Sequence, residues 1–264
     1  MQESFKLDRK RRILETLQAD GRVTVGHLKE LLQTSDATIR RDLRELAEEG
    51  LLRRGHGGAI ANSPVAPEPP VIQRMLDRSH CKECIGAAAS KLVRDGESVF
   101  LGSGSTVAYV ARHLTQHQGL TVVTNALTVA HELAAAEGVT VVVTGGVMRS
   151  SELSLVGHIT EQALQEIRVD RVIIGVPAIS LTDGLTNDYL HEVMTDRRII
   201  ELAPELVVVA DHSKLDRCCS AFIAPATRIN TLVTDSHVAP AVLQPYRDAG
   251  LHVIVAEPEG AEIP

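Results

Sequence analysis

Small polar residues and glycines follow five apolar, β-branched runs in the second part of the 264-residue chain. The first of these groups, residues 102–106 (GSGST), opens a predicted helix, so backbone N–H groups, hydroxyls and a helix N-terminus would form a cradle for an anion. Lys214 follows another run and offers a compact positive charge suited to a phosphate. We therefore expect a pocket for a polar, phosphorylated small molecule, lined by Ser103, Gly104, Ser105, Thr106, Thr124, Asn125, Gly145, Gly146, Asp183, Asp188, Glu192 and Lys214.

A second set of side chains, near the N-terminus, is suited to reading DNA. Residues 24–43 (TVGHLKELLQTSDATIRRDL) place apolar residues at helical spacing on both sides of a short break at Gln33 and Thr34. Ser35 stands where the second helix needs an N-cap, and two adjacent arginines follow. The pattern predicts a helix-turn-helix whose second helix enters the major groove. The buried stripes should be Val25, Leu28 and Leu32 on the first helix, and Ile39, Leu43 and Leu46 on the second.

The flanking residues predict the rest of a winged helix. Ile13, Leu14 and Leu17 mark an earlier helix, and residues 22–24 are suited to a short strand. Apolar and basic residues flank a glycine-rich turn at 55–58, so a wing would carry arginines toward the phosphate backbone. The predicted DNA-binding residues are Ser35, Thr38, Arg40, Arg41, Arg44, Arg53, Arg54 and His56.

A proline-rich stretch divides the chain. Residues 62–70 (NSPVAPEPP) hold four prolines in nine residues, which is typical of an extended spacer; a structured loop packed on either domain is the alternative. We expect a DNA-binding domain over residues 1–61 and a ligand-binding domain over residues 71–264. Residues 1–60 carry a net charge of +2 and the remainder −9, so the basic excess lies in the DNA-binding part.

Strand and helix patterns alternate after the spacer. Strands are expected at the apolar runs 98–101, 120–124, 139–144, 172–176, 206–210, 231–234 and 252–256. Helical stretches are expected between most of these runs, at 107–114, 127–136, 159–167, 192–202 and 239–249. Such alternation is typical of a parallel sheet covered on both faces, and its ligands bind outside the carboxyl ends of the strands. The expected fold class is α/β: an N-terminal winged helix-turn-helix domain followed by a C-terminal, mostly parallel α/β domain.

Other kinds of site find less support in the sequence. GSGST is not GxGxxG and no Walker pattern occurs, so dinucleotide and nucleoside-triphosphate sites are disfavoured. Cys81 and Cys84 have CxxC spacing beside His80, and Cys218 and Cys219 are adjacent, but there is no second CxxC. We expect reduced thiols, no metal site and no cofactor. No apolar run approaches about 18 residues and no signal peptide is recognisable, so we expect a cytoplasmic protein.

The motifs of both parts resemble those of the DeoR family of bacterial transcription regulators. TIRRDL at 38–43, the L-x-E-x-G-L pattern at 46–51 and RRGHGGA at 53–59 are similar to its N-terminal domain. GSGST, TN at 124–125, GG at 145–146, SLVG at 154–157, DYLHEV at 188–193 and DHSK at 211–214 follow the order of its sensor domain. The resemblance implies a sugar-phosphate sensor similar in fold to ribose-5-phosphate isomerase and glucosamine-6-phosphate deaminase. The family more often has an Asp before GTT in the first loop, so the departure here leaves the sugar open.

The isomerase-like fold raises an alternative, a sugar-phosphate isomerase or deaminase with an attached DNA-binding domain. Its general base would be Glu192, Asp188 or Asp183. However, residues 178–184 read AISLTDG where the isomerase has an acid-rich DGAD-type motif, and a regulator needs a ligand that persists. We therefore expect no enzyme activity. Glu192 is equally suited to a helix N-terminal charge stabilised by the helix dipole and to a contact with a sugar hydroxyl.

Together these patterns predict a transcriptional regulator, a repressor of sugar-metabolism genes that is relieved when a phosphorylated sugar binds. The expected partners are double-stranded operator DNA, the phosphorylated sugar, and further copies of the chain in a homodimer or homotetramer, because two-fold oligomers suit palindromic operators. No membrane partner is expected.

Overall fold

The computed structural model describes residues 9–258 with gaps at 11, 15, 18–21, 49–51, 56 and 62–68. The chain splits into two compact units, Met1–Glu68 and Pro69–Pro264. Most of the expected spacer, residues 62–68, lies outside the described residues, as does the expected end of the first helix at Asp20 and Gly21.

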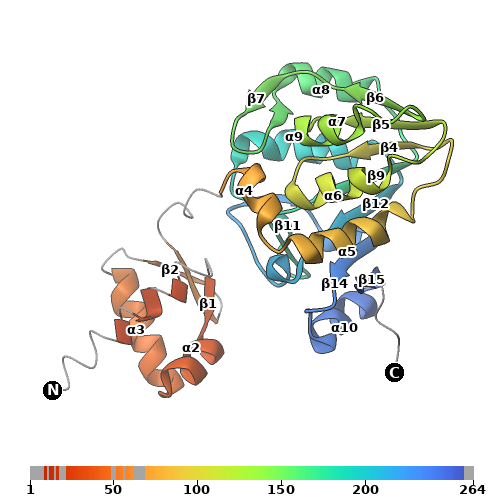
Figure 1. The fold of residues 1–264 in the computed structure, drawn as a ribbon. Helices are drawn as coiled ribbons and strands as arrows, with labels where there is room; N and C mark the ends of the chain where they lie inside the picture. Colours follow the sequence, from red (N-terminus) through yellow and green to blue (C-terminus); the bar gives the residue numbers. More distant parts are fainter. Residues whose placement is uncertain are drawn as a thin grey trace, which may run out of the picture. The chain divides into compact units, whose positions relative to one another are not determined.

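The N-terminal unit combines helices with a small antiparallel sheet (Figure 1). Residues 12–14, 16 and 17 are helical. They are followed by β1 (Arg22–Thr24), α2 (Val25–Leu32), α3 (Asp36–Glu48), β2 (Leu52–Gly55) and β3 (Gly58–Ala61). The strand order is β1-β3-β2, so the wing hairpin is completed by the strand that precedes the helix pair.

The apolar stripes expected from spacing form the core of this unit. Val25 and Leu28 of α2 pack with Ile39, Leu43 and Leu46 of α3, together with Ile13, Leu17, Val23, Leu52 and Ala59. The break between the helices falls at Gln33, whose φ of 48° is left-handed and ends α2. The helix-turn-helix and the wing strands expected from the sequence are therefore confirmed.

A seven-stranded parallel sheet organises the C-terminal unit, in the order β15-β14-β12-β9-β4-β5-β6. Its strands are β4 (Ser98–Leu101), β5 (Leu120–Thr124), β6 (Val139–Val143), β9 (Arg171–Gly175), β12 (Glu205–Val209), β14 (Thr231–Asp235) and β15 (His252–Ala256). The helices are α4 (Val71–Leu76), α5 (Ser79–Ser90), α6 (Ser105–His113), α7 (Leu127–Leu133), α8 (His158–Gln165), α9 (Leu190–Ile200) and α10 (Pro240–Asp248). The expected α/β class is confirmed.

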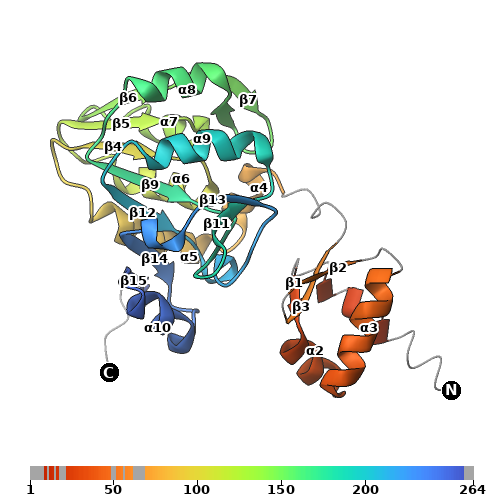
Figure 2. The same cartoon turned by 180° about the vertical axis from the view of Figure 1, so that it is seen from behind.

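Successive strand residues point to opposite faces of this sheet and build two cores. On β12, Val207 and Val209 pack with α5, α6 and α7, whereas Leu206 and Val208 pack with α8, α9 and α10. Figure 1 looks onto the face covered by α5, α6 and α7, and Figure 2 shows α9 in front of the strands on the other face. Both faces are buried along the central strands, which is why these strands read as continuous apolar runs.

Short strands add two further sheets that the sequence patterns did not predict. The hairpin β7 (Val147–Arg149) and β8 (Ser154–Val156) is antiparallel, and β10 (Ala178–Ser180), β11 (Gly184–Asn187) and β13 (Ala221–Ala224) form a second antiparallel sheet. These strands lie outside the strand–helix alternation that marks the parallel sheet, so that pattern did not reveal them. None of the helices in the described part of the chain has the length and apolar character needed to cross a membrane.

Candidate DNA-binding surface and effector site

The α3 helix presents three arginines to solvent. Arg40, Arg41 and Arg44 are exposed, while the Ile39 and Leu43 side chains are buried on the opposite side. Ser35 caps the helix as expected, because its Oγ accepts the N–H of Thr38 at 3.3 Å. Thr38 Oγ1 in turn lies 2.9 Å from Ser35 Oγ. A rigid, capped helix therefore displays the positive charges, which is the arrangement that a major-groove reader needs.

A buried ion pair holds α3 against the first helical segment. Arg9 Nε donates to Asp42 Oδ2 at 2.5 Å, and Arg9 Nη2 donates to Oδ1 at 3.2 Å. Asp42 is buried, and its hydrogen bond raises the pKa of Arg9 above the ordinary value. Asp42 was not predicted from the sequence, although its position three residues after Ile39 places it near the buried face of α3. The pair positions the helix turn that carries Arg40 and Arg41.

The wing is built around a close approach of two strands. A Cβ added at Gly58 would lie 1.9 Å from the carbonyl oxygen of Val23, so the pairing of β1 with β3 requires glycine there. Arg53 and Arg54 lie on β2, opposite Ile60 and Ala59. Their side chains, and His56 as a whole, lie outside what the structure describes, so their expected phosphate contacts stay predictions.

The loop after β4 lies at the carboxyl edge of the large sheet. Gly102 N–H donates to Ile173 O of β9 at 2.9 Å, and Gly104, with a φ of +124°, precedes α6. The first helical hydrogen bond of α6 joins Ala108 N to Gly104 O at 3.1 Å. The N–H groups of the preceding first-turn residues, Ser105 among them, therefore point out of the helix end, as an anion cradle requires.

Thr124 and Asn125 join neighbouring strand ends. Thr124 Oγ1 donates to Leu101 O at 2.7 Å and accepts Ala126 N–H at 2.9 Å. The side chain of Thr124 thus holds the GSGST loop beside β5. Asn125 is buried and its Nδ2 donates to Leu155 O at 3.2 Å, but among the described residues its Oδ1 has no hydrogen-bond donor. A buried acceptor of this kind needs a donor from water or a ligand.

Gly145 and Gly146 lie against α8. Thr160 Oγ1 donates to Gly145 O at 2.7 Å, and a Cβ added at Gly146 would lie 2.1 Å from the same hydroxyl. Both glycines have positive φ values, of 74° and 126°. Their backbone is therefore shaped by the contact with Thr160, and Thr144 N–H ties the segment to Thr124 O at 3.0 Å.

Lys214 lies in the 3₁₀ turn η1 (His212–Lys214) after β12. Burial, followed by the nearby Asp188 carboxylate, raises the pKa of the Cys219 thiol to about 12, and the positive charge of Lys214 opposes this shift. Lys214 and Asp188 therefore both lie close to Cys219. Ser220 N–H donates to Asp188 Oδ1 at 2.8 Å, which orients that carboxylate.

Lys82 of α5 is a second cation near Lys214 and was not predicted from the sequence. Its Nζ donates to the carbonyl oxygens of Arg74 and Asp77 at the end of α4, the second at 2.5 Å. Burial lowers the pKa of Lys82, and the charges of Arg74 and Lys214 lower it too, whereas Asp211 raises it. An anion bound near Lys214 would be attracted by the positive charges of both Lys214 and Lys82.

The structure does not bring Asp183 together with Asp188. Asp183 closes the turn between β10 and β11, where Ser180 Oγ donates to its Oδ2 at 3.0 Å. Asp188 follows the other end of the four-residue strand β11. At about 3.3 Å per residue, five residues of extended strand separate the backbones of Asp183 and Asp188 by roughly 16 Å.

Glu192 is the centre of a buried polar cluster. Its carboxylate accepts hydrogen bonds from Arg149 Nη1 at 2.5 Å, Ser154 Oγ at 2.8 Å and Asn187 Nδ2 at 3.3 Å. Asn187 Nδ2 also donates to Asp196 Oδ2 at 3.2 Å. Burial, followed by the negative charge of Glu192, raises the pKa of Asp196 to about 8. Glu192 therefore joins the β7–β8 hairpin to α9 through contacts within the protein.

Comparison with known proteins identifies both units. Residues 9–65 match the family model described as DeoR-like helix-turn-helix domain, and residues 77–236 match that described as DeoR C terminal sensor domain. The chain belongs to the DeoR family of transcriptional regulators. The resemblance expected from TIRRDL and the later motifs is thereby confirmed.

Several curated relatives are similar along nearly their whole length. The transcriptional repressor AccR of Agrobacterium fabrum is 33% identical, over 87% of this chain and 89% of that protein. The glycerol-3-phosphate regulon repressor of Escherichia coli K12 is also 33% identical, over 89% and 93%. The regulator GolR of Listeria innocua is 29% identical, over 96% and 100%. Among solved structures, ribose 5-phosphate isomerase A from Neisseria gonorrhoeae aligns over 51% of this chain and 52% of its own, with 17% identity and a TM-score of 0.38.

Proposed function

We propose that this DeoR-family regulator is a repressor whose C-terminal unit binds a phosphorylated sugar and whose N-terminal unit then releases operator DNA. The observation that carries the proposal is the position of the α6 N-terminus and of Lys214, which follow β4 and β12 at the carboxyl edge of the parallel sheet, with β9 between these two strands. One relative is named for a glycerol-3-phosphate regulon, which supports a phosphorylated polyol or sugar as the effector class.

Different residues of this site are suited to different parts of the ligand. The N–H groups of Ser105 and Thr106 at the start of α6, with the hydroxyl of Ser103, suit the phosphate, and Lys214 neutralises its charge. Asp188 suits sugar hydroxyls as an acceptor. The open Oδ1 of Asn125 is a further acceptor for an effector hydroxyl. Four of the other predicted residues, Gly104, Thr124, Gly145 and Gly146, shape the strand ends that hold these groups.

DNA binding is assigned to the exposed face of α3, with Arg40, Arg41 and Arg44, and to the wing. Two copies of this unit would read a palindromic operator, so a homodimer or homotetramer is the proposed working form. The effector weakens DNA binding only to the extent that it prefers the arrangement of the copies that does not bind DNA.

The decisive experiment compares Lys214→Ala with Lys91→Ala, an exposed lysine at the end of α5. Sugar phosphates and the matching free sugars are screened by thermal shift, because binding to the native state raises the midpoint. The sugar phosphate found is then titrated into a complex with DNA selected by the protein from a random library. We expect wild type and Lys91→Ala to release the DNA, and Lys214→Ala to bind it normally but to require at least about tenfold more effector, since about 1.4 kcal/mol corresponds to tenfold.

Two results would contradict the proposal. Equal calorimetric affinity for a sugar and its phosphate would remove the phosphate site at Ser105 and Lys214. Conversion of the bound sugar phosphate into another sugar phosphate, lost in Glu192→Gln, would support the isomerase-type alternative.

A further inference from the structure

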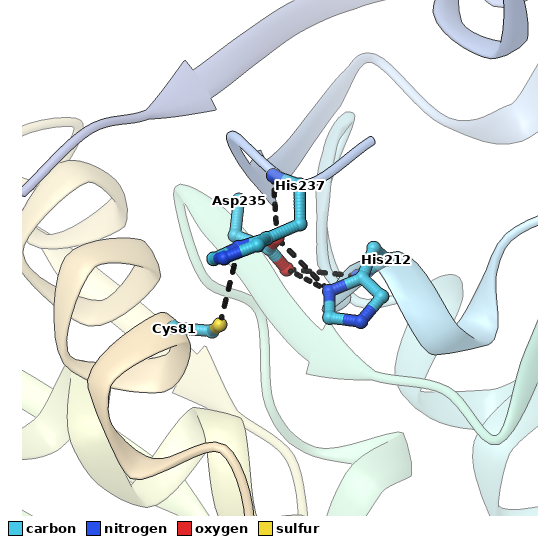
Figure 3. A group of neighbouring side chains, drawn as sticks. All are labelled: Cys81, His212, Asp235 and His237. Carbon is cyan, nitrogen blue, oxygen red and sulfur yellow. Dashed lines mark hydrogen bonds and ion pairs between the residues drawn. The ribbon is translucent and has the colours of Figure 1, made fainter. Parts of the chain in front are cut away.

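Four potential metal ligands from separate parts of the C-terminal unit converge at the edge of the sheet. Cys81 is in the first turn of α5, His212 begins η1, Asp235 ends β14, and His237 follows it. One ligand atom from each side chain lies within 4.8 Å of the others. Figure 3 shows the four side chains pointing toward one another from a helix, a 3₁₀ turn and the end of a strand.

The distances are close to those of a tetrahedral zinc site. Cys81 Sγ lies 3.6 Å from His237 Nδ1. Zinc bonds of about 2.3 Å to sulfur and 2.0–2.1 Å to nitrogen imply a sulfur–nitrogen edge of about 3.6 Å in a tetrahedron. Asp235 Oδ1 lies 3.0 Å from Nδ1 of both His212 and His237. A nitrogen–oxygen edge of about 3.3 Å then requires the ligands to separate by only about 0.3 Å.

The ligand set selects the class of metal. A thiolate, two imidazoles and one carboxylate suit Zn²⁺, whereas Mg²⁺ and Ca²⁺ prefer oxygen ligands. The thiolate and the carboxylate together carry two negative charges, which neutralise one divalent ion. When the metal binds, the Cys81 thiol gives its proton to solvent and its sulfur forms the bond to zinc.

The protein already holds the carboxylate in place. The N–H of His212 donates to Asp235 Oδ2 at 2.8 Å, and the N–H of His237 donates to Oδ1 at 2.9 Å. Such outer hydrogen bonds orient ligating groups in metal sites. Asp235 and Cys81 are buried, while the His237 side chain is 62% exposed. The cluster is therefore rigid on its inner side and open to entry of an ion on its outer side.

We propose that Cys81, His212, Asp235 and His237 form a zinc-binding site that joins the start of α5 to the carboxyl ends of β12 and β14. The candidate metal ligands in the sequence are the CxxC pair beside His80, together with Cys218 and Cys219, and no metal site is expected from them. This site instead takes one cysteine of that pair and three ligands that lie far along the chain.

The test uses the untagged full chain, stripped with a chelator and dialysed against Zn²⁺. We expect about one zinc ion per chain by elemental analysis, and a higher thermal midpoint with Zn²⁺ than without it. Co²⁺ should give the visible bands of a tetrahedral site and a thiolate-to-cobalt charge-transfer band.

Matched variants separate this site from adventitious binding. Cys81→Ser and His237→Ala should each lower zinc affinity at least tenfold and abolish the cobalt bands. Cys84→Ser on the same helix and His252→Ala on β15 should behave as wild type. Circular dichroism of each variant checks that it is folded. Failure of the wild type to bind zinc, or an unchanged cobalt spectrum in Cys81→Ser, would overturn the proposal and leave two histidines hydrogen-bonded to a structural carboxylate.

Discussion

Arg149 Nη1 donates a hydrogen bond to Glu192 Oε2 at 2.5 Å, and the two side chains are 14% and 4% exposed. The pair connects the β7–β8 hairpin to the first turn of α9. The Arg149 guanidinium also lies 4.2 Å from the ring centre of Tyr189. Arg149 is therefore held by two residues, Glu192 and Tyr189. Ser154 Oγ donates to the other oxygen of the Glu192 carboxylate at 2.8 Å, so Glu192 also joins the SLVG and DYLHEV motifs, a connection that the sequence alone did not reveal.

We expect Glu192→Ala to destabilise the C-terminal unit by about 3 kcal/mol, because removing one partner leaves the buried charge of Arg149 uncompensated. Thermal and urea unfolding followed by circular dichroism measure the loss. The matched control is Glu201→Ala, whose exposed pair with Arg198 at 3.2 Å should contribute less than about 1 kcal/mol. Equal losses in the two variants would show that the Arg149 pair is no stronger than a surface contact.

The raised pKa of Asp196 gives the C-terminal unit a pH-dependent stability. The folded state keeps the proton to about pH 8, whereas an unfolded aspartate releases it near a pKa of about 3.9. Between these values the folded state binds more protons, so its stability falls as pH rises and the loss is complete above about pH 8. Asp196→Asn, uncharged throughout, should remove this part of the decline.

Thermal midpoints of wild type and Asp196→Asn between about pH 5 and pH 9 test this slope. The wild type should lose several degrees more than the variant over that interval. Asp248→Asn, an exposed residue that accepts from Gln244 at 2.8 Å, is the control and should follow the wild type. Parallel curves for wild type and Asp196→Asn would mean that Asp196 is ionised in the folded protein.

The Arg9–Asp42 pair should determine how firmly α3 is held. Asp42→Asn weakens a bidentate, charge-assisted contact, which we expect to cost about 1–3 kcal/mol of local stability. Hydrogen exchange of residues 36–48, measured by mass spectrometry, should accelerate in this variant. Asp36→Asn, which removes the charge of an exposed pair with Lys29 at 3.2 Å, should leave exchange in the middle of α3 unchanged. Identical protection in both variants would contradict a positioning role for Asp42.

Arg41 should contribute directly to DNA binding. Arg41→Ala should weaken binding to a selected operator by about 1–3 kcal/mol if it makes a bidentate base contact. Its exposure on α3 means that the thermal midpoint should barely change. Arg247→Ala, which removes the same charge from α10, is the control. Unchanged gel-shift affinity in both Arg41→Ala and Arg40→Ala would show that this face of α3 does not bind DNA.

Local patterns predicted the elements that position the DNA-binding face. The spacing of Ile39, Leu43 and Leu46 identified the buried stripe of α3, and Ser35 identified its start. Likewise the runs at 98–101 and 120–124 coincide with β4 and β5. These features were accessible because each is encoded within a single helix or a single strand.

Relations between distant segments were not accessible in the same way. Helix α4 has only six residues, directly after prolines, and its last carbonyls are held by Lys82 from the next helix. The partners of Glu192 come from three separate elements. His212 meets Asp235 because β12 and β14 are neighbours in the sheet, and strand order cannot be read from periodicity.

The strand order also sets the sequence in which the C-terminal unit can be built. The first strand of the sheet to leave the ribosome, β4, lies between β5 and β9. Its pairing with β5 needs only a short crossover, but its other edge stays open until β9 has been made, some seventy residues later. Because contacts distant in the chain form slowly, a nascent chain that pauses before Arg171 exposes an unpaired apolar edge, and that interval is when we expect it to depend most on chaperones.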